Sequence, residues 1–141
     1  MVLDGDMFLF EHNFEAQSSE LCKIREMVRH TAEESGCSVD CAELIVIAVS
    51  EACMNIIQHG YHSKPGGSII VEIRKRGNSL IIRLRDFADS VDPSQVRSRD
   101  LGDIRPGGLG THFIKEVMDE IEFLVPPNGI GNLLQMVKII A

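Results

Sequence analysis

The spacing of apolar residues predicts two helices in the first half of the chain. The first is expected from Ser18 or Ser19, either of which can cap it, to about Glu34. The second is expected from Asp40, which with a glutamate three residues on resembles a capping arrangement, to about Gly60. The apolar face of the first helix repeats every three or four residues: Leu21, Ile24, Met27 and Val28.

Strand patterns fill most of the remaining apolar segments. Strands are expected over about residues 7–14, 68–76, 79–87, 119–125 and 132–140. Gly77-Asn78 suits a tight hairpin turn, so this part of the sheet should be antiparallel. A further helix over about 110–118 should return the chain to the sheet. We therefore expect an α+β fold, a two-layer sandwich of a mixed, largely antiparallel sheet with helices on one face.

The length of 141 residues and the hydrophobic content of 44% are those of a single domain, 1–141, with a sizeable core. Residues 92–110 contain few apolar side chains and should form a lid loop. No apolar run approaches the ~20 residues that cross a bilayer, and the first residues lack a secretion signal, so a cytoplasmic location is expected. A net charge of −7 argues against a general affinity for nucleic acid.

The second predicted helix contains a carboxylate next to its apolar residues. Glu51 follows the apolar run 44–49, so this helix should be almost wholly buried, and burying an unpaired carboxylate is costly. Asn55 and His59 follow at intervals of four, which places all three on one drifting face. The pattern favours a ligand site. A glutamate satisfied by backbone groups or by solvent at the helix edge is the alternative.

A second acid, Asp86, ends the strand predicted over 79–87. By parity it lies on the side of Leu80, Ile82 and Leu84, which is the core side. An aspartate that only caps the turn after the strand is the alternative interpretation.

The segment 106–111, Pro-Gly-Gly-Leu-Gly-Thr, runs straight into a predicted helix. Glycines allow backbone N–H groups to approach a ligand closely, and a helix start adds further donors, so the segment suits a phosphate chain. Taken alone this is a weak signal, because such loops are common. The segment matches neither the Walker A loop nor the dinucleotide fingerprint.

Four cysteines, Cys22, Cys37, Cys41 and Cys53, form no paired C-x-x-C clusters. Reduced and partly buried thiols are therefore expected, since a metal site needs more ligands than these residues offer.

Together the polar segments resemble the nucleotide-binding boxes of the GHKL, or histidine-kinase-like, ATPases. The likeness is closest to the bacterial anti-sigma factor serine/threonine kinases. Residues 47–61 resemble their N-box, 86–92 the next box and 106–114 the glycine-rich box, while 131–138 look like their last strand. The resemblance covers nearly all of the chain from about residue 10, and it implies the Bergerat fold.

The resemblance also implies residue roles. Glu51 would be the general base, and Asn55 would offer its side-chain oxygen to Mg²⁺. Asp86 would accept a hydrogen bond from the adenine amino group. Ala88 stands where the family usually has glycine, so its Cβ could crowd the base. The residues of the glycine-rich loop would surround the nucleotide phosphates: Gly107, Gly108, Leu109, Gly110 and Thr111.

The activity that follows from the resemblance uses ATP and Mg²⁺. The chain would phosphorylate a serine or threonine of an anti-anti-sigma (antagonist) protein, sequester a sigma factor and form a homodimer. An alternative is a non-catalytic nucleotide-binding module that holds a sigma factor or its antagonist. Ala88 is the sequence feature that favours this module.

Overall fold

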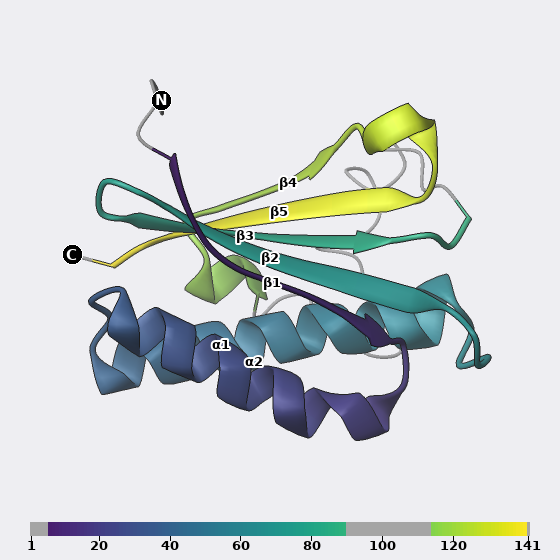
Figure 1. Cartoon of the computed structure of the whole chain (residues 1–141), viewed down its shortest axis with the longest axis horizontal. Helices are drawn as coiled ribbons and strands as arrows, with labels where there is room; N and C mark the ends of the chain where they lie inside the picture. The colour runs from purple at the N-terminus through teal and green to yellow at the C-terminus, as the bar shows by residue number, and fades with distance from the viewer. Residues whose placement is uncertain (1–5, 90–113, 141) are drawn as a thin grey trace.

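A computed structural model describes residues 6–89 and 114–140 of the chain. One sheet packs on a layer of helices (Figure 1). Its strands run in the order β1-β2-β3-β5-β4, and every pairing is antiparallel. The predicted two-layer α+β fold is confirmed, and within the described strands no parallel pair accompanies the antiparallel ones. The strands are β1 (Asp6–Glu15), β2 (Ser68–Arg76), β3 (Ser79–Asp86), β4 (Glu120–Leu124) and β5 (Asn132–Ile139).

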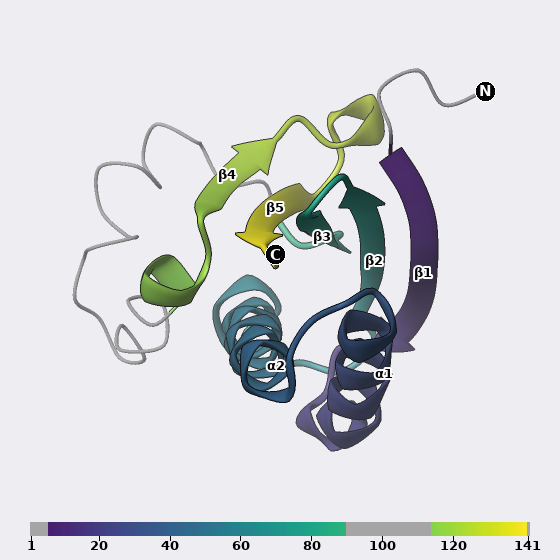
Figure 2. The same ribbon diagram turned by 90° about the vertical axis from the view of Figure 1, so that its left-hand side faces the viewer.

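The helices cover one face of this sheet, as Figure 2 shows. α1 (Leu21–Glu34) follows a 3₁₀ turn, η1 (Ser18–Glu20). α2 (Val39–Asn55) continues without a break into a π-helical turn, η2 (Ile56–Gly60). Both predicted helices are therefore confirmed in extent, but the predicted cap at Ser18 or Ser19 is wrong, because the N-cap of α1 is Glu20. Residues 114–117 are also helical, which agrees with the described part of the helix expected over 110–118.

The start of α2 differs from the prediction. Its N-cap is Ser38, whose Oγ accepts a hydrogen bond from the amide of Cys41 at 3.1 Å. Asp40 lies inside the first turn instead, where a carboxylate interacts favourably with the positive end of the helix dipole. Ser38 can cap because its backbone is extended, with φ −69° and ψ 163°.

The core lies between the sheet and the helices. Leu80, Ile82 and Leu84 of β3 belong to it, as their alternation predicts, and the core continues into α1 and α2. The expectation that α2 is almost wholly buried is wrong, because Leu44 and Ile47 are each 41% exposed. A helix in a two-layer fold is buried only against the sheet and its neighbouring helix, so its remaining side faces outward.

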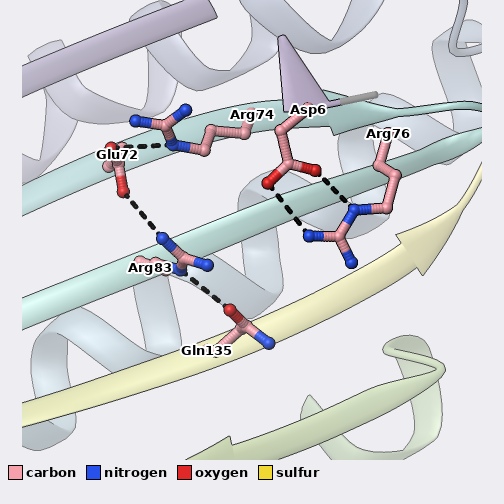
Figure 3. A network of polar contacts seen from close by, with 6 residues as sticks. All are labelled: Asp6, Glu72, Arg74, Arg76, Arg83 and Gln135. Atoms are coloured by element: carbon pink, nitrogen blue, oxygen red, sulfur yellow. Dashed lines mark hydrogen bonds and ion pairs between the residues drawn. The ribbon is translucent and has the colours of Figure 1, made fainter. Parts of the chain in front are cut away.

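The opposite face of the sheet carries a network of polar contacts (Figure 3). Arg83 of β3 donates to Gln135 Oε1 of β5 at 2.8 Å, and its Nη1 lies 3.6 Å from Oε1 of Glu72 on β2. The Nε of Arg74 lies 3.0 Å from Oε2 of the same glutamate. Cross-strand pairs of this kind stabilise neighbouring strands and satisfy charges on an uncovered face. Over residues 6–89 and 114–140, no helix has the length and apolar content that crossing a bilayer requires.

Candidate functional site

The end of the α2–η2 helix meets the end of β3. A Cβ placed on Gly60 would lie 3.4 Å from the Cβ of Ala88, so the two residues lie side by side. The Tyr61 hydroxyl accepts a hydrogen bond from Phe87 N at 2.7 Å and donates to Ser68 O at 2.8 Å. We call this contact region, formed by residues 60–61 and 86–88, the α2–β3 junction. It brings the end of the helix that carries the predicted polar residues next to the turn that follows Asp86.

Asp86 is the buried acid of the junction. Its residue is 5% exposed and continues the core-facing side of β3, as predicted. Oδ1 accepts from Ala88 N and from Asn132 Nδ2, both at 3.0 Å. Burial raises the pKa of the carboxyl group, and these two hydrogen bonds lower it in part. The bond from Ala88 is also the turn cap of the alternative interpretation, so one carboxylate both caps the turn and faces inward.

The hydrogen bonds to Asp86 leave one oxygen for a ligand. Throughout the described part of the chain, the donors that reach this carboxylate reach Oδ1. Oδ2 can therefore accept a hydrogen bond from a bound group without displacing a donor that belongs to the described residues. A carboxylate whose other oxygen is already fixed presents this acceptor at a defined position, which favours recognition of a ligand N–H group.

The start of β5 contacts Asp86 through Asn132 and Gly131. Asn132, which pairs with Asp86 in the sheet, donates from Nδ2 to the carboxylate and also to Asp89 O at 3.1 Å. Gly131 has φ +81°, and a Cβ there would lie 2.0 Å from Asp86 O. Only glycine leaves room for this backbone approach.

Asn132, Gly131 and Tyr61 were not singled out as site residues from the sequence. The predicted strand at 132–140 indicated where the first two lie, but its register against β3 was not predictable. For Tyr61, no local pattern indicated the two strands that its hydroxyl would join.

Glu51 and Asn55 lie on α2, in the helix layer that Asp86 faces, and both are half-buried. His59 follows in the π-helical turn η2. Because a π-helix is wound more widely than an α-helix, the predicted shared α-helical face of residues 51, 55 and 59 does not extend to His59 unchanged. Its Nε2 is buried and makes no hydrogen bond; Arg85 Nε is the other such side-chain atom in the parts of the chain that the structure describes. A buried ring nitrogen of this kind is a group that a polar ligand can satisfy.

The glycine-rich loop cannot be placed against these residues. Its predicted members, Gly107, Gly108, Leu109, Gly110 and Thr111, fall within 90–113 and so lie outside the described residues. The same holds for the whole of the predicted lid, 92–110. Contact between this loop and the α2–β3 junction stays a prediction.

The described residues fit a nucleotide better than a dedicated metal cage. Within 6–89 and 114–140, no group of three or more His, Cys, Asp or Glu residues could hold a metal ion. Mg²⁺ bound together with a nucleotide needs little from the protein, because phosphate oxygens and water fill most of its coordination sphere. A single amide oxygen such as that of Asn55 fits this pattern. The cysteines are free thiols, with Cys37 Sγ 3.9 Å from Cys41 Sγ.

Comparison with known proteins agrees with this architecture. The family model described as "Histidine kinase-like ATPase domain" matches residues 14–138. A serine-protein kinase RsbW of Bacillus subtilis is 32% identical over 115 residues, which cover 75% of this chain and 71% of the relative. The RsbW of Halalkalibacterium halodurans is 30% identical over 131 residues, covering 87% of this chain and 78% of that protein.

A solved structure adds evidence on the fold alone. The crystal structure of the RsbU and RsbW domains of a Mycobacterium tuberculosis protein superposes with a TM-score of 0.63 at 16% identity. The match covers 92% of this chain and 32% of that longer chain. The family expected from the motifs is thus confirmed by sequence and by fold. This chain belongs to the histidine kinase-like ATPase domain family and, within it, to the RsbW serine-protein kinases.

Proposed function

We propose that this chain is an ATP-dependent kinase that phosphorylates a serine or threonine of an anti-anti-sigma protein and sequesters a sigma factor. Membership of the RsbW kinases supports the activity. The observation that carries the nucleotide site is Asp86, a buried carboxylate whose Oδ1 is fixed by Asn132 and Ala88. Its Oδ2 is the acceptor for the adenine amino group. A purine without that amino group would leave a buried charge unpaired, so the site selects adenine.

Glu51 is proposed as the general base. It lies on α2 one turn before Asn55, in the helix layer that Asp86 faces. Its carboxylate takes the proton of the substrate hydroxyl as that oxygen attacks the γ-phosphorus of ATP and the bond to the leaving ADP breaks. Asn55 would hold Mg²⁺ through its side-chain oxygen, and the bound ion would supply charge neutralisation at the phosphates.

Residues 107–111 are proposed to surround the phosphates, and 92–110 to form the lid of a single domain. The family resemblance supports both assignments, and it also supports the partner class and a homodimer. The cytoplasmic location expected from the sequence stays a prediction.

Phosphate transfer tests the proposal directly. The chain is incubated with Mg²⁺, ATP labelled in the γ-phosphate and a candidate antagonist protein, and label on the antagonist is measured. Glu51→Ala should reduce transfer by about 10²- to 10⁴-fold, the usual contribution of a general base, with little change in ADP affinity. The matched control is Glu43→Gln on the same helix, because the Glu43 carboxylate pairs with Arg29 at the surface, 2.9 Å from its Nε. This control should transfer normally.

The same assay separates the alternatives. Intact transfer in Glu51→Ala would remove the base assignment while leaving the kinase in place. A wild-type chain that forms a complex with the antagonist or a sigma factor but never labels the antagonist would be the non-catalytic module. Asn55→Ala should weaken nucleotide binding in the presence of Mg²⁺ more than in its absence.

A further inference from the structure

Tyr61 is the residue that ties the α2–β3 junction together. It follows η2 directly, and its hydroxyl uses both of its hydrogen-bonding capacities on backbone groups. It donates to Ser68 O at 2.8 Å, at the first residue of β2, and accepts from Phe87 N at 2.7 Å, directly after β3. One phenol oxygen therefore links the end of the helix to the ends of two strands.

The ring of Tyr61 is held as firmly as its hydroxyl. A Cβ on Gly67 would lie 2.5 Å from the ring carbon Cε1, so the ring lies flush against a position where only glycine fits. The ring also packs against the hydrophobic core. Immediately after it, His62 and Ser63 adopt left-handed backbone conformations, with φ 55° and 60°, and turn the chain away. The packed ring therefore leaves the hydroxyl little freedom to move.

Through Phe87 the hydroxyl acts on Asp86. Phe87 lies between Asp86 and Ala88, and the amide of Ala88 donates to Asp86 Oδ1. The Tyr61 contact fixes the middle amide of this turn, while Asn132 donates to the Asp86 carboxylate from β5. Without the hydroxyl, Phe87 N–H would lose its acceptor, and the turn could move to find another. Burial and the charge of Asp86 raise the pKa of Tyr61, so its phenol stays protonated at neutral pH.

We propose that Tyr61 is a positioning residue for adenine selectivity: it holds the 86–88 turn where Asp86 Oδ2 meets the purine amino group. The inference rests on the proposed nucleotide function. In it, Tyr61 touches neither the nucleotide nor the substrate protein. Its effect should therefore appear in the choice between purines, rather than in affinity for nucleotides in general.

The test compares ADP with inosine diphosphate, which has a carbonyl oxygen in place of the amino group. Dissociation constants are measured by calorimetry for wild type, Tyr61→Phe and Asp86→Asn. Wild type should prefer ADP by about 10- to 100-fold, since a site built for an N–H group rejects an analogue that lacks it. Tyr61→Phe keeps the ring against Gly67 and should lose most of this preference, mainly through weaker ADP binding. Asp86→Asn should lose it as well.

A matched control removes a hydroxyl elsewhere. Ser38→Ala also deletes an oxygen that accepts from a backbone amide, but at the far end of α2. It should destabilise the protein and leave the preference for ADP unchanged. If Tyr61→Phe weakened both nucleotides equally, as a loss of general stability would, the positioning role would be refuted.

Failure of the two proposals can be told apart. Wild type without a preference for ADP refutes the adenine site, and the role of Tyr61 with it. Wild type with a preference that Asp86→Asn abolishes and Tyr61→Phe retains refutes the role of Tyr61 alone.

A measurement on the unmutated chain covers the case in which Tyr61→Phe does not fold. Tyr61 is the only tyrosine and the chain has no tryptophan, so its intrinsic tyrosine fluorescence reports this residue alone. Saturation with ADP should change that fluorescence more than saturation with inosine diphosphate. Equal changes would count against the proposal.

Discussion

Asp86 illustrates at the scale of one residue how a proposed binding site opposes stability. Its burial raises the pKa because the charged form loses solvation, and the hydrogen bonds from Asn132 and Ala88 compensate only in part. The folded protein therefore holds a carboxylate whose charged form is less favourable there than in water. A buried charge of this kind is typical of functional sites.

Asp86→Asn should bind ADP about 10- to 100-fold more weakly, the value of a hydrogen bond to a charged group. Whereas this variant should bind ADP more weakly, its free energy of unfolding at neutral pH should benefit from the loss of the buried charge. A raised pKa means that Asp86 contributes stability below the unfolded value of 3.8, and that this contribution is lost as the pH rises through the folded pKa. The free energy of unfolding of the variant should therefore rise relative to that of wild type as the pH increases from 3.8 to 7.

Urea unfolding of both proteins across this pH range measures the difference. If wild type instead became more stable relative to the variant with rising pH, the surroundings of the carboxylate would stabilise its charged form rather than penalise it by burial.

Ala88 occupies the position where the resemblance leads one to expect glycine. It does not adopt a positive φ, and its Cβ lies near Gly60, at the helix end. Ala88→Gly should therefore lower stability by about 0.5–1 kcal/mol through added freedom of the unfolded chain. It should change ADP affinity by less than about threefold, or about 0.7 kcal/mol.

The contrary result for Ala88 would have wide consequences. If wild type bound no ATP in a titration and Ala88→Gly did, the pocket of the natural chain would be degenerate and the kinase assignment wrong.

At the scale of the element, α2 matters most, because its bounds and winding position Glu51 and Asn55. It starts at a serine cap, and after Asn55 it widens into a π-helical turn that leads into the α2–β3 junction. π-Turns inside helices often occur at functional sites, where the widened backbone redirects the side chains that follow. Here the residues redirected are His59 and Tyr61.

Ser38→Ala should destabilise the protein by about 1 kcal/mol, because the amide of Cys41 loses its acceptor. Ser38→Gly should cost only a few tenths of a kcal/mol, since glycine at an N-cap leaves the amide open to water. Urea titration distinguishes the two. Asp40→Ala is the informative comparison, and a larger loss there than in Ser38→Ala would restore Asp40 as the cap.

At the scale of the whole molecule, the sheet order brings together residues that are distant in the chain. β3 lies between β2 and β5, so Asn132 pairs with Asp86 at a separation of 46 residues in sequence. The proposed nucleotide site thus depends on the last hairpin as well as on the motifs that indicated it. Damage at the start of β5 should reach Asp86.

Gly131→Ala and Gly129→Ala form a matched pair that tests this dependence. Both glycines have positive φ, +81° and +67°, so each alanine carries backbone strain of about 1–2 kcal/mol. Only at Gly131 would the Cβ also meet the carbonyl oxygen of Asp86, at 2.0 Å, whereas Gly129 has nothing within 4 Å. Gly131→Ala should therefore lose at least about 2 kcal/mol more stability than Gly129→Ala.

ADP affinity should follow the same order, falling in Gly131→Ala and staying near wild type in Gly129→Ala. Equal losses of stability in the two variants would mean that strain alone acts at both positions, and that β5 does not support the site through this contact.

By itself, the sequence determined the helices, the strands, the inward direction of Asp86 and the family. These follow from period, turn chemistry and short motifs, which depend on residues close together in the chain. Tertiary structure decided that Ser38 caps α2 and that Leu44 and Ile47 remain exposed. It also decided that Asn132 and Gly131 contact Asp86, and that Tyr61 binds the amide of the residue after it. The physical reason is that strand register and side-chain partners are set by the combined packing of all elements, which no local pattern encodes.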